Sequence, residues 1–115
     1  MRSGASTPEE LETLLEDAFV VRDRAAVVEL FEPDGVVAAD ARDTARGAAI
    51  GSFVAGLWAQ DMTYLARPGR VLQARDTGLI VAGRAISVVR RRDGHWRYAI
   101  SLLQTDAKPN GGTQQ

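Results

Sequence analysis

The chain has 115 residues, of which 45% are hydrophobic and 25% charged, and its formal net charge is −1. This composition predicts a single globular domain over residues 7–106, between unstructured ends at 1–6 and 107–115. With no Cys, one His and one Lys, disulfides, zinc–thiolate centres and multi-histidine sites are excluded, and we expect no metal and no cofactor.

The first half of the chain reads as helical. Thr7-Pro8-Glu9-Glu10 has the form of a helix start, with a capping Thr and a Pro at the first helical position. The apolar residues that follow recur at helical spacing and form one stripe: Leu11, Leu14, Leu15, Ala18 and Phe19. We expect a second helix from Asp23 to near Phe31, and then a turn at 33–35.

A strand over 36–40 is expected next, followed by a third helix that begins at Gly47. The stripe of this helix consists of Ile50, Phe53, Val54, Leu57 and Trp58. The remaining segments have strand composition: 62–67, 70–75, 78–91 and 95–105. Gly83 marks either a bulge or a full turn. Helices followed by a run of antiparallel strands indicate an α+β domain.

The stretch 87–103, SVVRRRDGHWRYAISLL, predicts two strands joined at Asp93-Gly94. It resembles the closing hairpin of the nuclear transport factor 2-like superfamily, which includes SnoaL-like and ketosteroid isomerase-like proteins. Segments 23–37 and 46–53 carry further cues in the matching order. SgcJ/EcaC-type proteins are the nearest subgroup, although Ser101-Leu102-Leu103 stands where they have Asp-Asn-Pro.

The resemblance implies a cone in which a curved antiparallel sheet wraps around three N-terminal helices. It also implies an internal cavity and homodimers packed sheet to sheet, for which the alternating Val and Arg residues of 84–92 are suited. Such folds host many activities.

The resemblance does not carry isomerase chemistry with it. That reaction needs a carboxylate base together with Tyr and protonated Asp donors, and alignment places Leu15, Ala39 and Ser87 at these positions. A limonene epoxide hydrolase-type relay has only Asp40, Arg84 and Asp106 as loose candidates.

Several residues remain as candidate site residues. Asp40 is a candidate base or water-orienting group, or else a loop cap. Tyr64 is a candidate catalytic hydrogen-bond donor, or else a rim residue. The candidate pocket residues are Trp58, Arg84, Tyr98, Ser101 and Gln104. For Trp58 and Tyr98 the sequence favours core packing over a pocket role, and Tyr98 is expected to share a face of the last strand with Trp96 and Ile100.

The predicted function is a small-molecule pocket protein of SnoaL-like type, with no assignable reaction, for an apolar polycyclic metabolite of secondary metabolism. The alternative is a non-catalytic ligand-binding or dimeric scaffold domain. We expect a small apolar or aromatic ligand and a homodimer as partners.

Nucleic acid is not expected as a partner, because Arg90, Arg91 and Arg92 alternate faces. A membrane is not expected either, because no apolar run approaches the ~20 residues of a span. A cytoplasmic location follows from the absence of a signal-like N-terminus.

Overall fold

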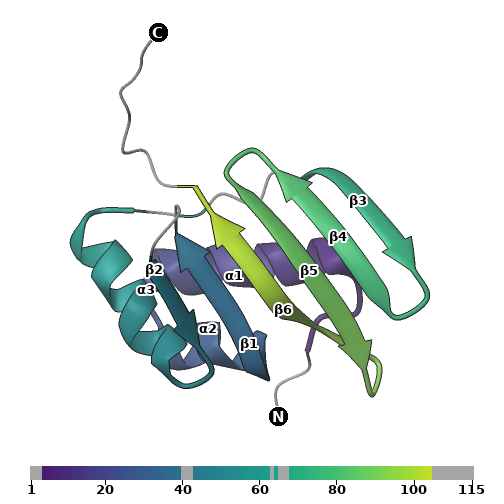
Figure 1. The fold of residues 1–115 in the computed structure, drawn as a ribbon, viewed down its shortest axis with the longest axis horizontal. Coiled ribbons are helices and arrows are strands. Elements are labelled where there is room, and N and C mark those ends of the chain that lie inside the picture. Colours follow the sequence, from purple (N-terminus) through teal and green to yellow (C-terminus); the bar gives the residue numbers. More distant parts are fainter. Residues whose placement is uncertain (1–3, 40–42, 63, 65–67, 105–115) are drawn as a thin grey trace, which may run out of the picture.

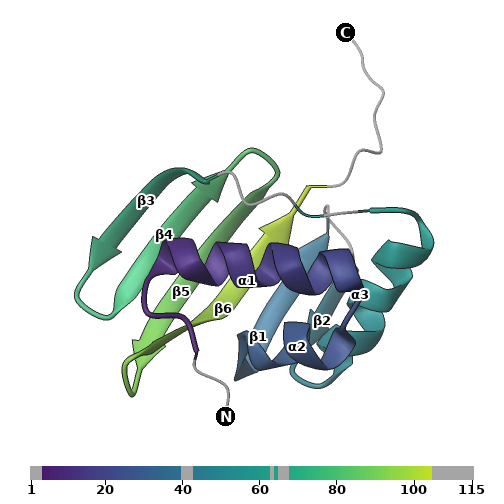
Figure 2. The same cartoon turned by 180° about the vertical axis from the view of Figure 1, so that it is seen from behind.

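A curved six-stranded sheet carries helix α1 across one face, and α2 and α3 pack together at one end (Figures 1 and 2). The computed structural model describes residues 4–39, 43–62, 64 and 68–104. The elements in chain order are α1 (Pro8–Val21), α2 (Arg24–Glu29), β1 (Phe31–Ala39), β2 (Asp43–Arg46), α3 (Ala49–Ala59), β3 (Pro68–Ala74), β4 (Thr77–Ala82), β5 (Ala85–Arg92) and β6 (His95–Leu103). The α+β cone is confirmed.

The helix boundaries follow local chemistry. The Thr7 hydroxyl accepts from the Glu10 backbone N–H at 3.0 Å, and Pro8 occupies the first turn, as the sequence predicts. Arg22 closes α1 in the left-handed region at φ 56°. The Asp23 carboxylate caps α2 at 3.1 Å from the Ala26 N–H. The third helix begins two residues later than predicted.

The sheet is mixed rather than antiparallel throughout. Its strand order is β2-β1-β6-β5-β4-β3, and β1 pairs with β6 in parallel. The expected all-antiparallel sheet is therefore wrong at this one pair. The chain reaches it by returning from β1 through β2, α3 and β3–β5 before β6 enters beside β1.

Strand β1 differs most from its prediction. It begins at Phe31, so α2 ends earlier than expected, and the predicted turn at 33–35 is an irregularity inside the strand. Gly35 is needed there, because a Cβ would lie 3.0 and 3.1 Å from the backbone oxygens of Glu32 and Tyr98. Strand β2 was not foreseen. Most of the strand expected over 62–67 lies outside the described residues, and Met62 and Tyr64 are not in a strand.

A bulge in β6 changes which side chains point inward. Val88 pairs with Ile100, but Val89 pairs with Tyr98, so Ala99 is an extra residue. The strict alternation expected for Trp96, Tyr98 and Ile100 is wrong for this reason. Trp96 and Tyr98 are buried, whereas Ile100 is 51% exposed on the outer face. Ser101 takes the inward position instead.

The long strand predicted over 78–91 is two strands. Gly83 and Arg84 form the connection between β4 and β5, so Gly83 marks a turn rather than a bulge. The Asp93-Gly94 hairpin is confirmed, with both residues at positive φ, 55° and 79°.

The expected unstructured leader is wrong for residues 4–6. Ala5 is fully buried and pairs with Trp96, whose N–H donates to the Ala5 carbonyl at 2.9 Å. Residues 1–3 and the expected tail at 107–115 lie outside the described residues. No helix within the described ranges is long and apolar enough to span a membrane.

Candidate functional site in the cone interior

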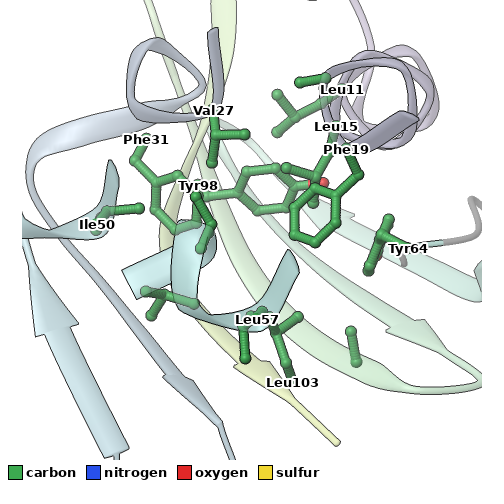
Figure 3. Close-up of a cluster of buried hydrophobic side chains, with 14 of the residues drawn as sticks. Leu11, Leu15, Phe19, Val27, Phe31, Ile50, Leu57, Tyr64, Tyr98 and Leu103 are labelled. Carbon is green, nitrogen blue, oxygen red and sulfur yellow. The ribbon is translucent and has the colours of Figure 1, made fainter. Parts of the chain in front are cut away.

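The interior of the cone holds a carboxylate with no solvent exposure. Glu12 lies on the buried side of α1, and Figure 3 shows its neighbours Leu11, Leu15 and Phe19 beside Tyr64 and Tyr98. A charged side chain in such a place is costly unless it is hydrogen-bonded. Its partners are therefore the first feature to establish.

Two tyrosines supply those partners. The Tyr64 hydroxyl donates to Glu12 Oε1 at 2.6 Å, and the Tyr98 hydroxyl donates to Glu12 Oε2 at 2.5 Å. The three residues lie 52 and 86 positions apart in the chain. Among the described residues, no cation forms an ion pair with Glu12. Within the described part of the chain, the Glu12 carboxylate is thus held by two neutral hydroxyl donors.

The tyrosines are held as neutral hydroxyls. Burial, and after it the negative charge of Glu12, raises the pKa of Tyr64 well above its ordinary value. The same two causes, in the same order, raise the pKa of Tyr98. Because both protons are already donated to Glu12, neither hydroxyl offers a proton to a substrate carbonyl in this arrangement.

Aromatic packing fixes the network in place. Phe19 contacts Trp58 edge-on, with ring centroids 5.5 Å apart, and contacts Tyr64 at 5.9 Å. Phe31 lies 5.1 Å from Tyr98 on the other side (Figure 3). The Trp58 indole N–H is buried and has no hydrogen-bond acceptor in the part of the chain that the structure describes. A buried indole N–H usually has a partner.

A second polar pair lies on β5 and β6. The Ser87 and Ser101 hydroxyls are 2.9 Å apart, both are buried, and the two residues face each other in register. Ser101 reaches this position only because of the bulge at Ala99. Each serine hydroxyl is the hydrogen-bond partner of the other, and the pair itself carries no charge.

The candidate residues from the sequence fall into separate groups. Tyr64 and Tyr98 meet at Glu12, Phe19 contacts both Trp58 and Tyr64, and Ser101 pairs with Ser87. Arg84 and Gln104 are exposed, where the Gln104 N–H donates to the Arg84 carbonyl at 2.8 Å. The Asp40 prediction lies outside the described residues, as does Asp106.

The residues at the positions aligned with isomerase roles lack the acidic and basic groups that the reaction needs. Leu15, Ala39 and Ser87 are all buried, but none of these side chains is a carboxylate or a phenol. The described residues also contain no group of three or more His, Asp or Glu that could hold a metal ion.

Sequence reasoning missed Glu12, although a signal was present. Glu12 stands three residues before Leu15 and seven before Phe19, so helical periodicity places it inside the apolar stripe. A carboxylate at such a position is either at the edge of the stripe or buried with partners. The two partners could not be named, because they lie on distant segments.

No family model matches this chain, and no curated protein matches it. Solved structures do. A ketosteroid isomerase-like protein from Erwinia carotovora atroseptica has a TM-score of 0.68 at 18% identity, over 87% of this chain and 94% of that one. An NTF2-like protein with a cystatin-like fold from Novosphingobium aromaticivorans has a TM-score of 0.64 at 20% identity, over 84% and 77%.

A protein of unknown function with a cystatin-like fold from Nostoc punctiforme scores 0.61 at 18% identity, over 84% of this chain and 86% of that one. These likenesses confirm the nuclear transport factor 2-like fold that the closing hairpin predicts. Nearness to SgcJ/EcaC-type proteins stays a prediction.

Proposed function

We propose that this chain is a small-molecule-binding protein whose cone interior holds a mostly apolar ligand next to Glu12, Tyr64 and Trp58. The observation that carries the proposal is the fully buried Glu12 carboxylate, held by two tyrosines without a cation among the described residues. Replacing a buried charge by apolar side chains is often neutral or stabilising. Its presence is therefore explained better by recognition than by stability.

The polar groups define the ligand that fits. A ligand acceptor, such as a carbonyl, hydroxyl or epoxide oxygen, would satisfy the unpartnered Trp58 N–H. The apolar body would pack against Phe19 and its neighbours, as drug-sized ligands do in mostly apolar sites. A planar polycyclic metabolite has this combination.

The arrangement favours binding over turnover. A general acid must release a proton to the substrate, but both tyrosine protons are engaged by Glu12 and their pKa values are raised. Both oxygens of the Glu12 carboxylate, in turn, already accept hydrogen bonds from the tyrosines, so neither can accept a substrate proton without giving up a partner. We therefore propose that the chain binds a ligand without converting it. Catalysis would require a substrate that replaces one tyrosine hydroxyl as the hydrogen-bond partner of Glu12.

The test is a ligand-observed NMR and thermal-shift screen with steroids, polyketide aromatics and terpene epoxides. A hit should bind at least about tenfold more weakly to Trp58→Phe and Tyr64→Phe. Thr13→Ala is the matched control, because Thr13 is exposed on the same helix as Glu12. No hit in any class, or equal binding to all variants, would refute this function.

The outer face of the sheet supports a second candidate, a dimeric scaffold. Ile86 lies opposite Leu102, and Val88 opposite Ile100, while helix α1 covers the other face of these strands. Ile86, Ile100 and Leu102 are exposed by 42%, 51% and 39%. An apolar row on adjacent strands of this kind is typical of an interface, and a second copy of the chain fits it by symmetry.

Light scattering tests the dimer. The wild type should show twice the chain mass of 12.4 kDa at micromolar concentration, and Ile100→Glu should show the chain mass. Val20→Glu is the control, because Val20 is 68% exposed on α1, away from the sheet. A wild-type monomer removes the scaffold candidate and leaves the binding proposal untouched.

A further inference from the structure

A groove lies at the end of the cone where β1 and β6 begin. It has a volume of about 910 Å³, and its lining comes from α1, α2, the start of β1, the segment at 4–5 and the start of β6. Figure 2 shows α2 and the N-terminal segment at this end of the sheet. Tyr64, Tyr98 and Glu12 do not line it. The groove is thus separate from the interior network.

The walls of the groove are mainly apolar. Leu14, Ala18 and Val21 of α1 form one side, and Ala26 and Val28 of α2 contribute to the other. Val21 is 70% exposed, which is unusual for a large aliphatic side chain beside a hollow. A volume of several hundred Å³ with such walls matches the range of small-molecule sites.

One end of the groove holds polar groups without partners. Arg97 lines it and is half-buried, and its side chain forms no ion pair or hydrogen bond with a described residue. His95, two positions earlier on β6, also lines it, and its Nδ1 is buried without a hydrogen-bond partner. Two positions apart on a strand, the two side chains share a face.

The neighbouring strand adds positive charge at the same place. Arg90 stands directly opposite Arg97, and Arg92 stands opposite His95. The buried Glu32 carboxylate engages Arg92 at 2.8 Å and Arg90 at 3.8 Å. Like charges facing each other across a strand pair repel unless an anion lies between them. Glu32 compensates Arg90 and Arg92, and no carboxylate of the described residues forms an ion pair with Arg97.

We propose that this groove binds a small apolar monocarboxylate, with its carboxylate on Arg97 and its apolar body along α1 and α2. Arg pairs with carboxylates in a bidentate fashion. Asp17, Glu29 and Glu32 also line the groove. A second negative group on the ligand would lie near these carboxylates, so dicarboxylates and phosphates should bind more weakly than a monocarboxylate.

Protein-observed NMR titration of the full chain tests the site. The probes are 4-phenylbutyrate, its neutral amide 4-phenylbutyramide, and the cation 4-phenylbutylamine, which share one apolar body. We expect 4-phenylbutyrate to shift the backbone amides of Leu30, Trp96 and Arg97, and to bind at least about tenfold more tightly than the amide or the amine.

Two variants and a control separate the charge from the apolar contact. Arg97→Gln should weaken 4-phenylbutyrate about tenfold or more and remove its preference over the amide. Ala26→Leu should weaken all three probes by filling the apolar wall. Arg70→Gln is the control, because Arg70 is an exposed arginine on β3, outside the groove lining.

The proposal is overturned if the amide or the amine binds as tightly as the carboxylate, or if Arg97→Gln binds it like the wild type. It is also overturned if the shifts map to Tyr64 and Tyr98 instead, or if 4-phenylbutyrate does not saturate by about 10 mM. These results leave the interior site to its own screen, since the two sites share no residue that either test changes.

Discussion

The interior network and the groove both set polar groups against apolar walls, but they differ in how those groups are partnered. In the interior, Glu12 accepts a hydrogen bond from each of two tyrosine hydroxyls, and the two serine hydroxyls bond to each other. In the groove, Arg97 and His95 Nδ1 have no partner among the described residues. Removing one partner from a paired buried group destabilises the fold, whereas the half-buried Arg97 side chain beside the groove is available to a ligand.

Removing one interior partner should have the largest effect. Tyr98→Phe leaves a buried carboxylate one donor short, so the free energy of unfolding should fall by about 3 kcal/mol. Urea denaturation followed by circular dichroism measures it. Adding Glu12→Leu to Tyr98→Phe should recover part of the loss, because the uncompensated charge is then gone. A loss below about 1 kcal/mol would show that water already serves Glu12.

Alkaline pH should lower the free energy of unfolding through the interior tyrosines and not through the groove residues. The folded-state pKa of both tyrosines is raised above the unfolded value of 10.0, so their contribution is fully present below pH 10 and is lost as the pH rises above it. With two tyrosines in the chain, stability should fall by up to about 2.7 kcal/mol per pH unit. Urea denaturation between pH 9 and about pH 11 measures this slope.

The composition of the chain makes the alkaline pH dependence easy to assign to the tyrosines. The chain has no Cys and a single Lys, so few other groups titrate in this range. Tyr64→Phe should halve the slope, whereas Arg97→Gln should leave it unchanged. Tyrosinate absorbance that appears before unfolding would contradict the assignment, because it would mean that the tyrosines ionise within the folded cone.

The serine pair gives a smaller test of the same rule. Ser101→Ala leaves the Ser87 hydroxyl buried without a partner, which should cost about 1 kcal/mol. Ser87→Ala should cost a similar amount, and the double variant should cost less than the sum of the two. Strict additivity would mean that the two hydroxyls do not depend on each other.

Arg97→Gln should have the smallest effect on stability, within about 0.5 kcal/mol of the wild type. Its guanidinium has no partner to lose in the described part of the chain, and it faces Arg90 across the strand pair. Denaturation at low and high salt measures this. A loss above about 1 kcal/mol would place Arg97 in a structural ion pair and count against the groove as a binding site.

Local signals account for the parts of the fold that were predicted correctly. Thr7, Pro8 and Asp23 act on backbone groups within a few residues, and the Asp93-Gly94 turn needs only its own positive φ angles. The unforeseen parts depend on distant segments. Pairing of β1 with β6 joins residues more than sixty positions apart, and the Ala99 bulge is defined only against β5.

The candidate site divides in the same way. Tyr64, Tyr98, Trp58 and Ser101 were chosen as residue types able to hold a ligand, and all four are buried in the cone. Glu12 is not among the predicted site residues, and nothing near it in the sequence indicates that two tyrosines from distant segments are its partners. The unpaired Arg97 was hidden among neighbouring arginines, three of which engage Asp76 or Glu32.

The sequence by itself determined the helix starts, the closing hairpin, the α+β class and the exclusion of thiol chemistry, because these follow from residue type and short-range spacing. Only the tertiary structure decided that Glu12 meets two tyrosines, that Ser101 faces inward, and that Arg97 has no counter-charge among the described residues. Each of these depends on which side chains from remote segments share a small volume. A carboxylate or a guanidinium acquires its role from those neighbours.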